Sequence, residues 1–389
     1  MESDALTPKI VVFLGSGASA FAGYHTFATF PDLIYDQTVR SQDGLPPLHS
    51  TTISLLEEIK DTLRKAAKPT THDNYLWALT DYKRLWLTLR VDGVLQTRFL
   101  TSTNLWGQFA YFAQTTEDAT NDITLTTLKH YSTNRVLEAQ QREEFSFDAM
   151  RRVHMLYTIL ASINNSEIPF LPVFTTNYDM LIEDLFSTFG NTDPHALPLI
   201  TGIPSNSTEG STWSSTQYFQ TGLRPHGLYL YRIHGCVCWF YHSFGDENVY
   251  FHRRDCMQQN PNMLCAMYPG QESLPGVNPH GFGYRQFHEM LLSCECVVFI
   301  GFSFRDDDIM HLVLSANSQR ETPLNVIVLD PSIRETDVIA NLEASSKRTP
   351  YPAKTLDVNK IKSIDARFGH SDFDTRLLEV LNQIIQKGD

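Results

Sequence analysis

The stretch Ile10-Val11-Val12-Phe13-Leu14-Gly15-Ser16-Gly17-Ala18-Ser19 decides the fold that this sequence predicts. Its first half, residues 10–14, is a short apolar run rich in β-branched residues, which is typical of a buried strand. Its second half, residues 15–19, consists of glycines and small residues and predicts a sharp turn into a helix. Glycine lets a backbone approach a phosphate closely, and the start of a helix presents N–H groups to an anion. The stretch therefore predicts a nucleotide-binding turn, and a tight turn without a ligand is the alternative.

Other apolar, strand-like runs in the chain also end in glycine or polar residues. They are residues 170–174 before Thr175-Thr176-Asn177-Tyr178-Asp179, residues 229–233 before His234-Gly235, residues 296–300 before Gly301-Phe302-Ser303, and residues 325–329 before Asp330. In an open parallel sheet, ligands bind outside the carboxyl ends of the strands. We therefore expect these glycine and polar residues to gather at one edge of a parallel sheet.

Two of these motifs also have a purely structural interpretation. Asn and Asp are favoured at helix N-caps, so Asn177 or Asp179 could simply begin the next helix. That interpretation accounts for one residue of the motif but not for Thr175, Asn177 and Asp179 together, whose alternation lets them project to one side. A single histidine such as His234 is more often structural than catalytic, but here it follows a strand-like run and precedes a glycine.

The order of these runs predicts one α/β domain over residues 1–389, with a Rossmann-like parallel sheet. Residues 36–165 are expected to form a large, predominantly helical insertion within it, because apolar residues recur there at helical spacing, as in residues 55–63. Residues 371–387 predict a C-terminal helix. Residues 194–225 are rich in Ser, Thr, Gly and Pro and predict a loop.

The composition argues against several classes of partner. The chain has 44 acidic and 31 basic residues and a net charge of −13, whereas nucleic-acid binders usually show a basic patch. No apolar run approaches the roughly 18 residues of a membrane span, and the acidic residues 1–4 do not resemble a signal peptide. Six cysteines in a chain of this length do not indicate a disulfide framework. We expect a cytoplasmic protein that binds neither nucleic acid nor membrane directly.

Taken together, the motifs resemble those of the sirtuins and the sirtuin-like NAD hydrolases. The family's first motif, Gly-Ala-Gly-x-Ser and then Gly-Ile-Pro-x-Phe-Arg, is similar to residues 15–19 and 23–28 of this chain. Its Thr-x-Asn-x-Asp, His-Gly and Gly-x-Ser motifs are similar to the stretches that begin at Thr175, His234 and Gly301. The resemblance spans roughly residues 8–331.

The resemblance implies that NAD is bound as a substrate and that Asn177 and His234 act at its nicotinamide ribose. It places Asp179 near the nicotinamide amide. An Asn side chain can orient a water molecule, and a His side chain can take a proton at neutral pH. The residues expected to bind NAD are Gly15, Ser16, Gly17, Ala18, Ser19, Gly23, Phe27, Thr175, Asp179, Gly301, Ser303 and Asp330.

The chain also departs from the family pattern. Ala28 and His25 stand where the family has Arg and Pro. Protein-deacylating sirtuins carry a zinc ribbon of two Cys-x-x-Cys pairs after the His-Gly motif. The cysteines that follow that motif here are Cys236, Cys238, Cys256 and Cys265, and they lack this spacing. Structural zinc favours closely spaced pairs, so no zinc is expected.

Without the zinc ribbon, the chain has no obvious binding site for an acyl-lysine peptide. The expected reaction is therefore the cleavage of NAD to nicotinamide and ADP-ribose. A protein deacylase and a non-catalytic NAD- or ADP-ribose-binding regulatory subunit are the alternatives. The resemblance extends to ribbon-lacking domains of bacterial antiphage systems, some of which work beside a HerA-type hexameric ATPase. It therefore implies such a partner, and the aromatic-rich insertion suggests a homo-oligomer.

Overall fold

A computed structural model describes most of the chain apart from one long segment and several shorter ones. The described residues are 7–24, 26, 48, 50–65, 130–131, 134–142, 145–190, 197–203, 211–222, 226–241, 249–251, 264–266, 279–346 and 357–386.

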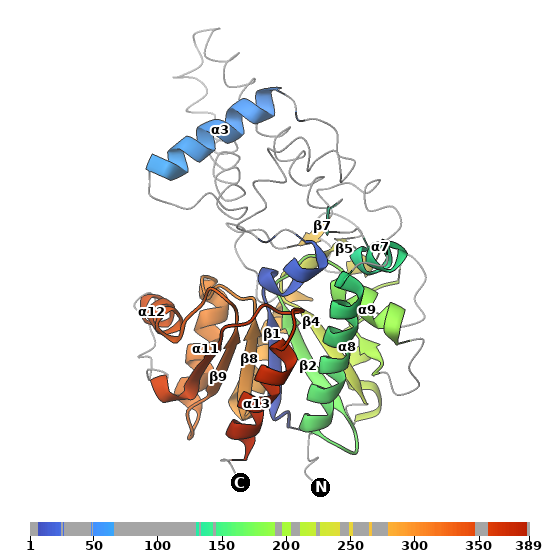
Figure 1. Ribbon diagram of the computed structural model, residues 1–389, viewed down its shortest axis with the longest axis vertical. Coiled ribbons are helices and arrows are strands. Elements are labelled where there is room, and N and C mark those ends of the chain that lie inside the picture. The colour runs from blue at the N-terminus through green and yellow to red at the C-terminus, as the bar shows by residue number, and fades with distance from the viewer. Residues whose placement is uncertain are drawn as a thin grey trace, which may run out of the picture.

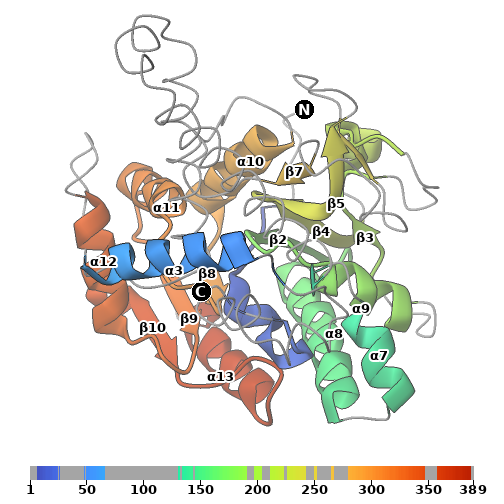
Figure 2. The same ribbon diagram turned by 90° about the horizontal axis from the view of Figure 1, so that it is seen from above.

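Seven parallel strands form the centre of the molecule (Figure 1). Their bounds are β1 Ile10–Leu14, β2 Phe170–Thr175, β3 Leu199–Ile200, β4 Gly227–Arg232, β8 Cys296–Ile300, β9 Asn325–Leu329 and β10 Ile361–Ile364. The order across the sheet is β10-β9-β8-β1-β2-β4-β3, and every pairing is parallel. Seen from above in Figure 2, β10, β9 and β8 lie on one side of the sheet and β2, β4 and β3 on the other.

The strands are apolar throughout because both faces of the sheet are covered, as parallel sheets require. In β1, Ile10, Val12 and Leu14 pack into one hydrophobic cluster, while Val11 and Phe13 pack into another on the opposite face. All five side chains are buried. The period of two in a strand thus divides one short sequence between two cores.

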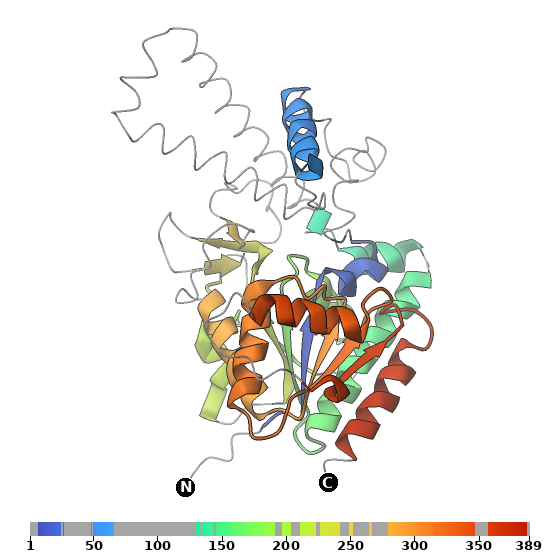
Figure 3. The ribbon, with the colours of Figure 1, turned by 90° about the vertical axis from the view of Figure 1, so that its left-hand side faces the viewer.

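Helices form a layer on each side of the sheet (Figures 1 and 3). On the Ile10 side lie the 3-10 helix η1 Ser16–Ala22 and the α-helices α7 Arg135–Arg142, α8 Phe145–Asn164, α9 Leu181–Phe189 and α13 Phe373–Ile385. On the Phe13 side lie the 3-10 helix η2 Ser215–Gly222 and the α-helices α10 His280–Ser293, α11 Asp307–Gln319 and α12 Glu335–Ser346.

Three further parts lie outside these two layers. Helix α3, Ser50–Lys65, is seen beyond the carboxyl edge of the sheet (Figures 1 and 3). A small antiparallel sheet of order β6-β5-β7 follows β4 directly. Its strands are β5 Gly235–Tyr241, β6 Val249–Phe251 and β7 Leu264–Ala266. The 3-10 helix η5, Val358–Lys360, precedes β10.

The topology places a switch point at the centre of the sheet. The chain begins at β1, moves to one side through β2 and β4, and then crosses to β8 on the other side of β1. The connections after β1 and β8 therefore leave in opposite directions. Such a switch point is where open α/β sheets bind ligands, at the carboxyl ends of the strands.

The predicted fold class is confirmed, including the Rossmann-like parallel sheet and the C-terminal helix, which is α13. The described parts of residues 36–165 include α3, α7 and α8, but residues 66–129 lie outside the description, so the helical insertion stays a prediction. None of the helices in the described ranges is long and apolar enough to cross a membrane.

Asn164, the last residue of α8, ties the beginnings of two central strands together. Its Oδ1 accepts a hydrogen bond from Ile10 N at 2.6 Å, and its Nδ2 donates to Ile10 O and Phe170 O, each at 3.0 Å. The register between β1 and β2 begins only at Val12 and Val173. Just before it β2 carries Pro172, which has no N–H to donate. The buried amide thus supplies bonds where the strand ladder is incomplete.

We predict that Asn164→Ala lowers the free energy of unfolding by about 2–4 kcal/mol, because three backbone groups would lose a buried partner. Urea unfolding followed by circular dichroism measures the change. Ser162→Ala, an exposed change on the same helix, is the control and should cost less than about 0.5 kcal/mol. A loss below about 1 kcal/mol for Asn164→Ala would contradict this role.

Candidate functional site

The predicted glycine and polar motifs gather at the carboxyl edge of the sheet, around the switch point between β1 and β8. Gly15 N donates to Ile300 O at 2.9 Å, and Gly17 N donates to Gly301 O at 3.0 Å. The loops after β1 and β8 therefore lie directly against each other. The loop after β2 joins them through Thr176 N, which donates to Leu14 O.

The glycines are required by this contact between loops. Gly301 has a φ of +58°, and a Cβ built on it would lie 2.2 Å from Ala18 N. A Cβ on Gly17 would lie 2.9 Å from Gly301 Cα, and one on Gly15 would lie 2.5 Å from Gly301 O. Real Cβ atoms do not approach backbone atoms so closely. The space beside these glycines is filled by protein backbone.

This geometry narrows the role expected for the glycine loop. The N–H groups of Gly15, Gly17 and Ala18 already donate to protein carbonyls, so they are not available to a phosphate as the sequence suggested. The segment that follows is the seven-residue 3-10 helix η1, not an α-helix. Gly23 ends η1 with a φ of +85°, which explains a glycine there without a ligand. Phosphate binding by this loop stays a prediction.

The loop after β2 turns its polar side chains toward the glycine loop. Thr175 Oγ1 donates to Leu14 O at 3.2 Å and accepts a hydrogen bond from Asn177 N at 2.9 Å. Asn177 Nδ2 donates to Gly15 O at 2.9 Å and to Ser19 Oγ at 3.0 Å. The structure therefore brings together the first two predicted motifs.

One atom of this arrangement has no partner. Asn177 Oδ1 is buried and has no hydrogen-bond partner among the described residues. A small cavity with room for about one water molecule is lined in part by Asn177, Ser19 and Asp179. An unsatisfied buried oxygen costs about 1–3 kcal/mol, so a bound water or ligand is expected beside it. The arrangement fits a ligand or water that donates to Asn177 Oδ1.

Asp179 is buried and lies two residues before helix α9, whose N-cap is Met180. Its Oδ1 accepts a hydrogen bond from Leu181 N, the first residue of the helix, at 3.0 Å. Asp179 therefore supports the start of α9 without being its N-cap. Burial raises the pKa of the Asp179 carboxyl, while the positive charge of Arg232 and hydrogen bonds from Leu181 N and Ser19 act to lower it. The carboxyl group therefore holds its proton more readily than an exposed aspartate does.

Sequence reasoning missed Arg232, the last residue of β4, because it lies in an otherwise apolar run. Its side chain is only 2% exposed and forms an ion pair with Glu183 of α9. Burial acts most strongly and lowers the pKa of Arg232, but the charge and hydrogen bonds of Glu183, together with the nearby Cys236 and Asp179, outweigh burial, and the pKa is raised. A charged residue inside an apolar strand pattern was the available signal, since such residues are almost never buried without a partner.

His234 follows in the turn between β4 and β5, at the same edge of the sheet. Its Nε2 lies 3.4 Å from Asp306 Oδ2, in the loop after β8, and 3.4 Å from the Tyr284 hydroxyl on α10. The His234 side chain is 18% exposed, so a ligand can reach it. Asp306 also caps α11 through Oδ1, which accepts from Asp308 N and Ile309 N. Sequence reasoning missed Asp306 and Tyr284 as neighbours of His234.

Two of the remaining predicted residues, Ser303 and Asp330, follow strands β8 and β9 and differ in exposure. Ser303 is exposed beyond the buried Phe302. Asp330 follows β9, and its Oδ1 accepts hydrogen bonds from Ser332 N and Ser332 Oγ. Phe27 lies outside the described residues. A contact of these three with NAD stays a prediction.

The first two cysteines after His234 lie in the hydrophobic core. Cys236 and Cys238 of β5 are fully buried, and Cys238 N lies 3.4 Å from Cys236 Sγ. Cys265 belongs to β7, and Cys256 lies outside the described residues. Within the described ranges no group of three or more His, Cys, Asp or Glu residues could hold a metal ion. The expectation of a zinc-free protein stays a prediction.

Comparison with known proteins finds a match between part of this chain and the model of one protein family. The family model of the SIR2-like domain matches residues 172–351, which include Asn177, His234 and Gly301. A solved structure of a mutant Sir2 homologue in complex with 2'-O-acetyl ADP ribose is similar at 10% sequence identity, over 96% of this chain and 92% of that chain, with a TM-score of 0.36. No curated protein matches the chain. The domain match and the parallel sheet support a sirtuin-like fold.

His280, the first residue of α10, fixes the turn that carries His234. Its Nδ1 lies 2.8 Å from Ile233 O. Burial lowers the pKa of His280 to about 4, although the hydrogen bond to Ile233 O opposes the shift. His280 is therefore neutral in the folded protein at pH 7, and its Nδ1–H donates to the carbonyl.

We predict that His280 makes the fold sensitive to mild acid. The His280 side chain has a pKa near 6.5 in the unfolded chain and near 4 in the folded chain. Protonation therefore favours the unfolded chain, and the free energy of unfolding falls as the pH is lowered from about 6.5 to about 4. From pH 7 to 5 the wild type should lose roughly 2 kcal/mol more than His280→Asn, which keeps a donor for Ile233 O. Urea unfolding at both pH values measures this, and equal losses in the two proteins would contradict it.

Proposed function

We propose that the protein is an NAD glycohydrolase, which cleaves NAD to nicotinamide and ADP-ribose. The proposal is carried by one observation: the unpartnered Asn177 Oδ1 and the accessible His234 lie at the same carboxyl edge of a sirtuin-like fold. Both belong to loops that meet at Arg232, which donates to Asn177 O and precedes His234 by two residues. The fold favours NAD as the substrate, and the two side chains suit hydrolysis.

The reaction needs little acid catalysis. The bond between ribose C1′ and the nicotinamide nitrogen breaks, and nicotinamide leaves with the electron pair as a neutral molecule. The transition state resembles an oxocarbenium ion, as in other glycosidic cleavages. A water oxygen then bonds to C1′, and its proton passes to a base. The groups required are a positioned acceptor for water or a ribose hydroxyl, and a base that works near neutral pH.

Asn177 suits the first requirement through its oxygen alone. Its Nδ2 already donates to Gly15 O and Ser19 Oγ, so the orientation of the amide is set and Oδ1 can only accept. A water or a ribose hydroxyl would donate to this oxygen. The amide would thus place the nucleophile or the ribose, whereas the sequence alone had left both ends of the amide open to that task.

His234 suits the second requirement. Asp306 Oδ2 is within reach of Nε2, and a carboxylate there favours the tautomer with hydrogen on Nε2. Nδ1 then keeps a lone pair that can accept a proton from water or from a ribose hydroxyl. In this proposal Asp306 orients the imidazole of His234.

We place the rest of NAD along the same edge. The phosphates would lie near Ser16 and Ser19, and the adenosine side near Gly301, Ser303 and Asp330. Thr175 and Asp179 would support the nicotinamide end. The exposed position of Ser303, in the loop after β8 and beside the β1–β8 switch point, supports this direction.

We further propose that the enzyme depletes NAD in the cytoplasm during antiphage defence, as a homo-oligomer with a HerA-type hexameric ATPase. The support is the resemblance of its motifs to those of SIR2-like domains in such systems. If the pure chain is inactive, the same assay is repeated with the ATPase added. An acyl-lysine peptide is included as a separate arm, because peptide-dependent release of nicotinamide would favour a deacylase.

We predict that His234→Ala separates catalysis from binding. The variant should bind NAD within about tenfold of the wild type, which is roughly 1.4 kcal/mol, because most contacts with NAD lie elsewhere. Its single-turnover rate should fall by about a hundredfold or more, as expected when a positioned base is lost. Calorimetric titration and release of nicotinamide measure the two quantities.

His370→Ala, a change at an exposed histidine, is the matched control and should leave both quantities unchanged. The assignment of His234 as the base fails if the variant has a lower melting temperature but a normal rate per folded molecule. In that case the histidine serves the turn and not the reaction.

A further inference from the structure

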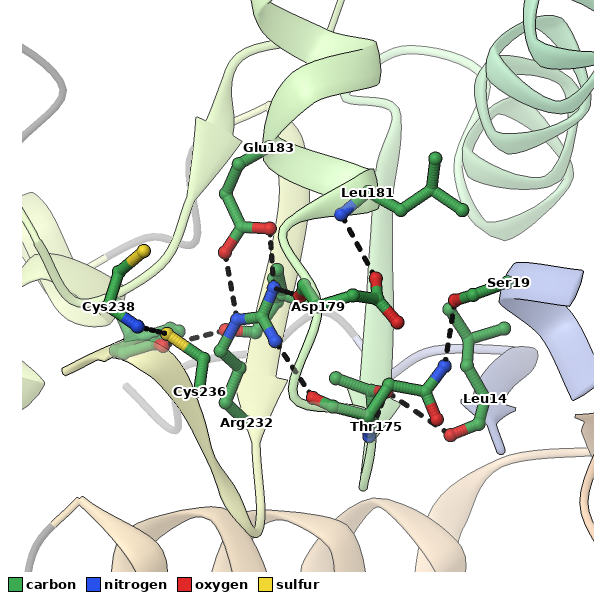
Figure 4. A network of polar contacts seen from close by, with 12 residues as sticks. Leu14, Ser19, Thr175, Asp179, Leu181, Glu183, Arg232, Cys236 and Cys238 are labelled. Carbon is green, nitrogen blue, oxygen red and sulfur yellow. Dashed lines mark hydrogen bonds and ion pairs between the residues drawn. The ribbon is translucent and has the colours of Figure 1, made fainter. Parts of the chain in front are cut away.

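Arg232 is the most heavily engaged buried charge in the described parts of the protein, and nothing in the proposed chemistry uses it. Its guanidinium makes four hydrogen bonds: two to the carboxylate of Glu183, one to Asn177 O at 3.0 Å and one to Asp179 O at 2.7 Å. Figure 4 shows Arg232 on one side of the loop after β2, with Ser19 on the other.

The bonds go to the backbone of the loop that carries Asn177. Carbonyls of Asn177 and Asp179 are two residues apart and point to the same side, where the planar guanidinium can reach both. The side chain of Asn177 points the other way and donates to Gly15 O and Ser19 Oγ. The loop is therefore held from both sides, and the position of Asn177 Oδ1 depends on each.

The contacts of Arg232 fix the orientation of the loop after β2 more than they stabilise the fold. The cost of removing two charges from water offsets much of the attraction within a buried ion pair, and a well-packed apolar pair of similar size often gives an equally stable fold. An apolar side chain in place of Arg232 would leave the two loop carbonyls without donors. A lysine would keep the charge but could not bridge one carboxylate and two carbonyls with fixed geometry, because its ammonium lacks the planar fork.

Arg232 also links the two proposed catalytic loops. Ile233 N, the next residue along, donates to Thr175 O at 2.9 Å, and His234 follows directly. Two successive residues, Arg232 through its side chain and Ile233 through its backbone N–H, thus join the end of β4 to the end of β2 and the loop after it. A shift of Arg232 would change the distance between Asn177 and His234.

We propose that Arg232, oriented by Glu183, is a positioning residue that holds the loop at residues 176–180 so that Asn177 Oδ1 faces the reacting ribose or water. This inference rests on the proposed function for its kinetic consequence. The clamp itself, defined as the contacts of Arg232 with Glu183, Asn177 O and Asp179 O, has a structural consequence that does not depend on catalysis.

The kinetic test uses Arg232→Lys and Glu183→Gln in the full chain. We expect Arg232→Lys to lower kcat for NAD cleavage by about tenfold or more while KM changes by less than about threefold, because misplaced groups slow the reaction more than they weaken binding. Glu183→Gln, which keeps the shape and loses the charge, should lower kcat in the same direction and replaces the lysine variant if that one does not fold. Arg376→Lys is the control. It changes an exposed arginine that also joins a carboxylate and a carbonyl, Asp372 and Asp365 O, and it should have no effect.

A double-mutant cycle with Asn177→Ala separates positioning from a general loss of stability. If Arg232 acts through Asn177, adding Arg232→Lys to Asn177→Ala should lower the residual single-turnover rate by less than about threefold. An equal fall in both backgrounds would overturn the proposal. So would a normal kcat per folded molecule in Arg232→Lys with only a lower melting temperature.

Hydrogen exchange followed by mass spectrometry tests the clamp without any activity. In Arg232→Lys the peptide covering residues 176–181 should exchange about tenfold faster, while β8 exchanges as in the wild type. If the wild type does not cleave NAD with or without an ATPase, the proposed function is wrong. The exchange result then decides by itself whether the clamp holds the loop at residues 176–180. Unchanged exchange in residues 176–181 would overturn it.

Discussion

The contact between the glycine loops after β1 and β8 is the constraint on which the rest of the site depends. Gly301 adopts a positive φ, and its Cα hydrogen occupies a place where a Cβ would lie 2.2 Å from Ala18 N. Because the loops can approach this closely, Gly17 N reaches Gly301 O. The same approach fixes Gly15, whose carbonyl then receives the Asn177 amide. One steric requirement at the switch point of the sheet thus sets the position of a side chain on the next strand.

The site combines groups that lower stability with groups that compensate for them. Asn177 Oδ1 has no partner among the described residues, and the buried Asp179 carboxyl is desolvated. The Arg232 and Glu183 pair supplies opposite charges close by, which lowers the cost of burying either one. Unsatisfied groups held by a rigid surrounding network are characteristic of preorganised sites, because reorganisation during a reaction is then small. The unpartnered Asn177 Oδ1 lowers the stability of the fold, whereas the hydrogen bonds from Arg232 to the carbonyls of Asn177 and Asp179 raise it.

The two proposed catalytic side chains differ in how the fold holds them. Asn177 is held on both sides and has one accepting atom left. His234 lies in a turn that is fixed through its neighbour Ile233, and its ring makes long contacts, each of 3.4 Å, with Asp306 and Tyr284. A fixed acceptor suits the placement of a substrate. A more exposed imidazole suits the exchange of a proton with solvent.

The sequence by itself determined the strands and the polar or glycine residues that follow them, because an apolar run of five or six residues and a glycine turn are local patterns. It missed β10, since Lys362 and Ser363 interrupt the apolar pattern of an edge strand, and it predicted an ordinary helix where η1 is a 3-10 helix. Only the tertiary structure decided that β8 lies beside β1. It follows that Gly15, Gly17 and Gly301 are needed because the backbones of the two loops contact each other. The tertiary structure alone paired Arg232 with Glu183, which is 49 residues away in the chain. Those contacts depend on strand order and on distances between loops, and no local pattern of residues encodes either.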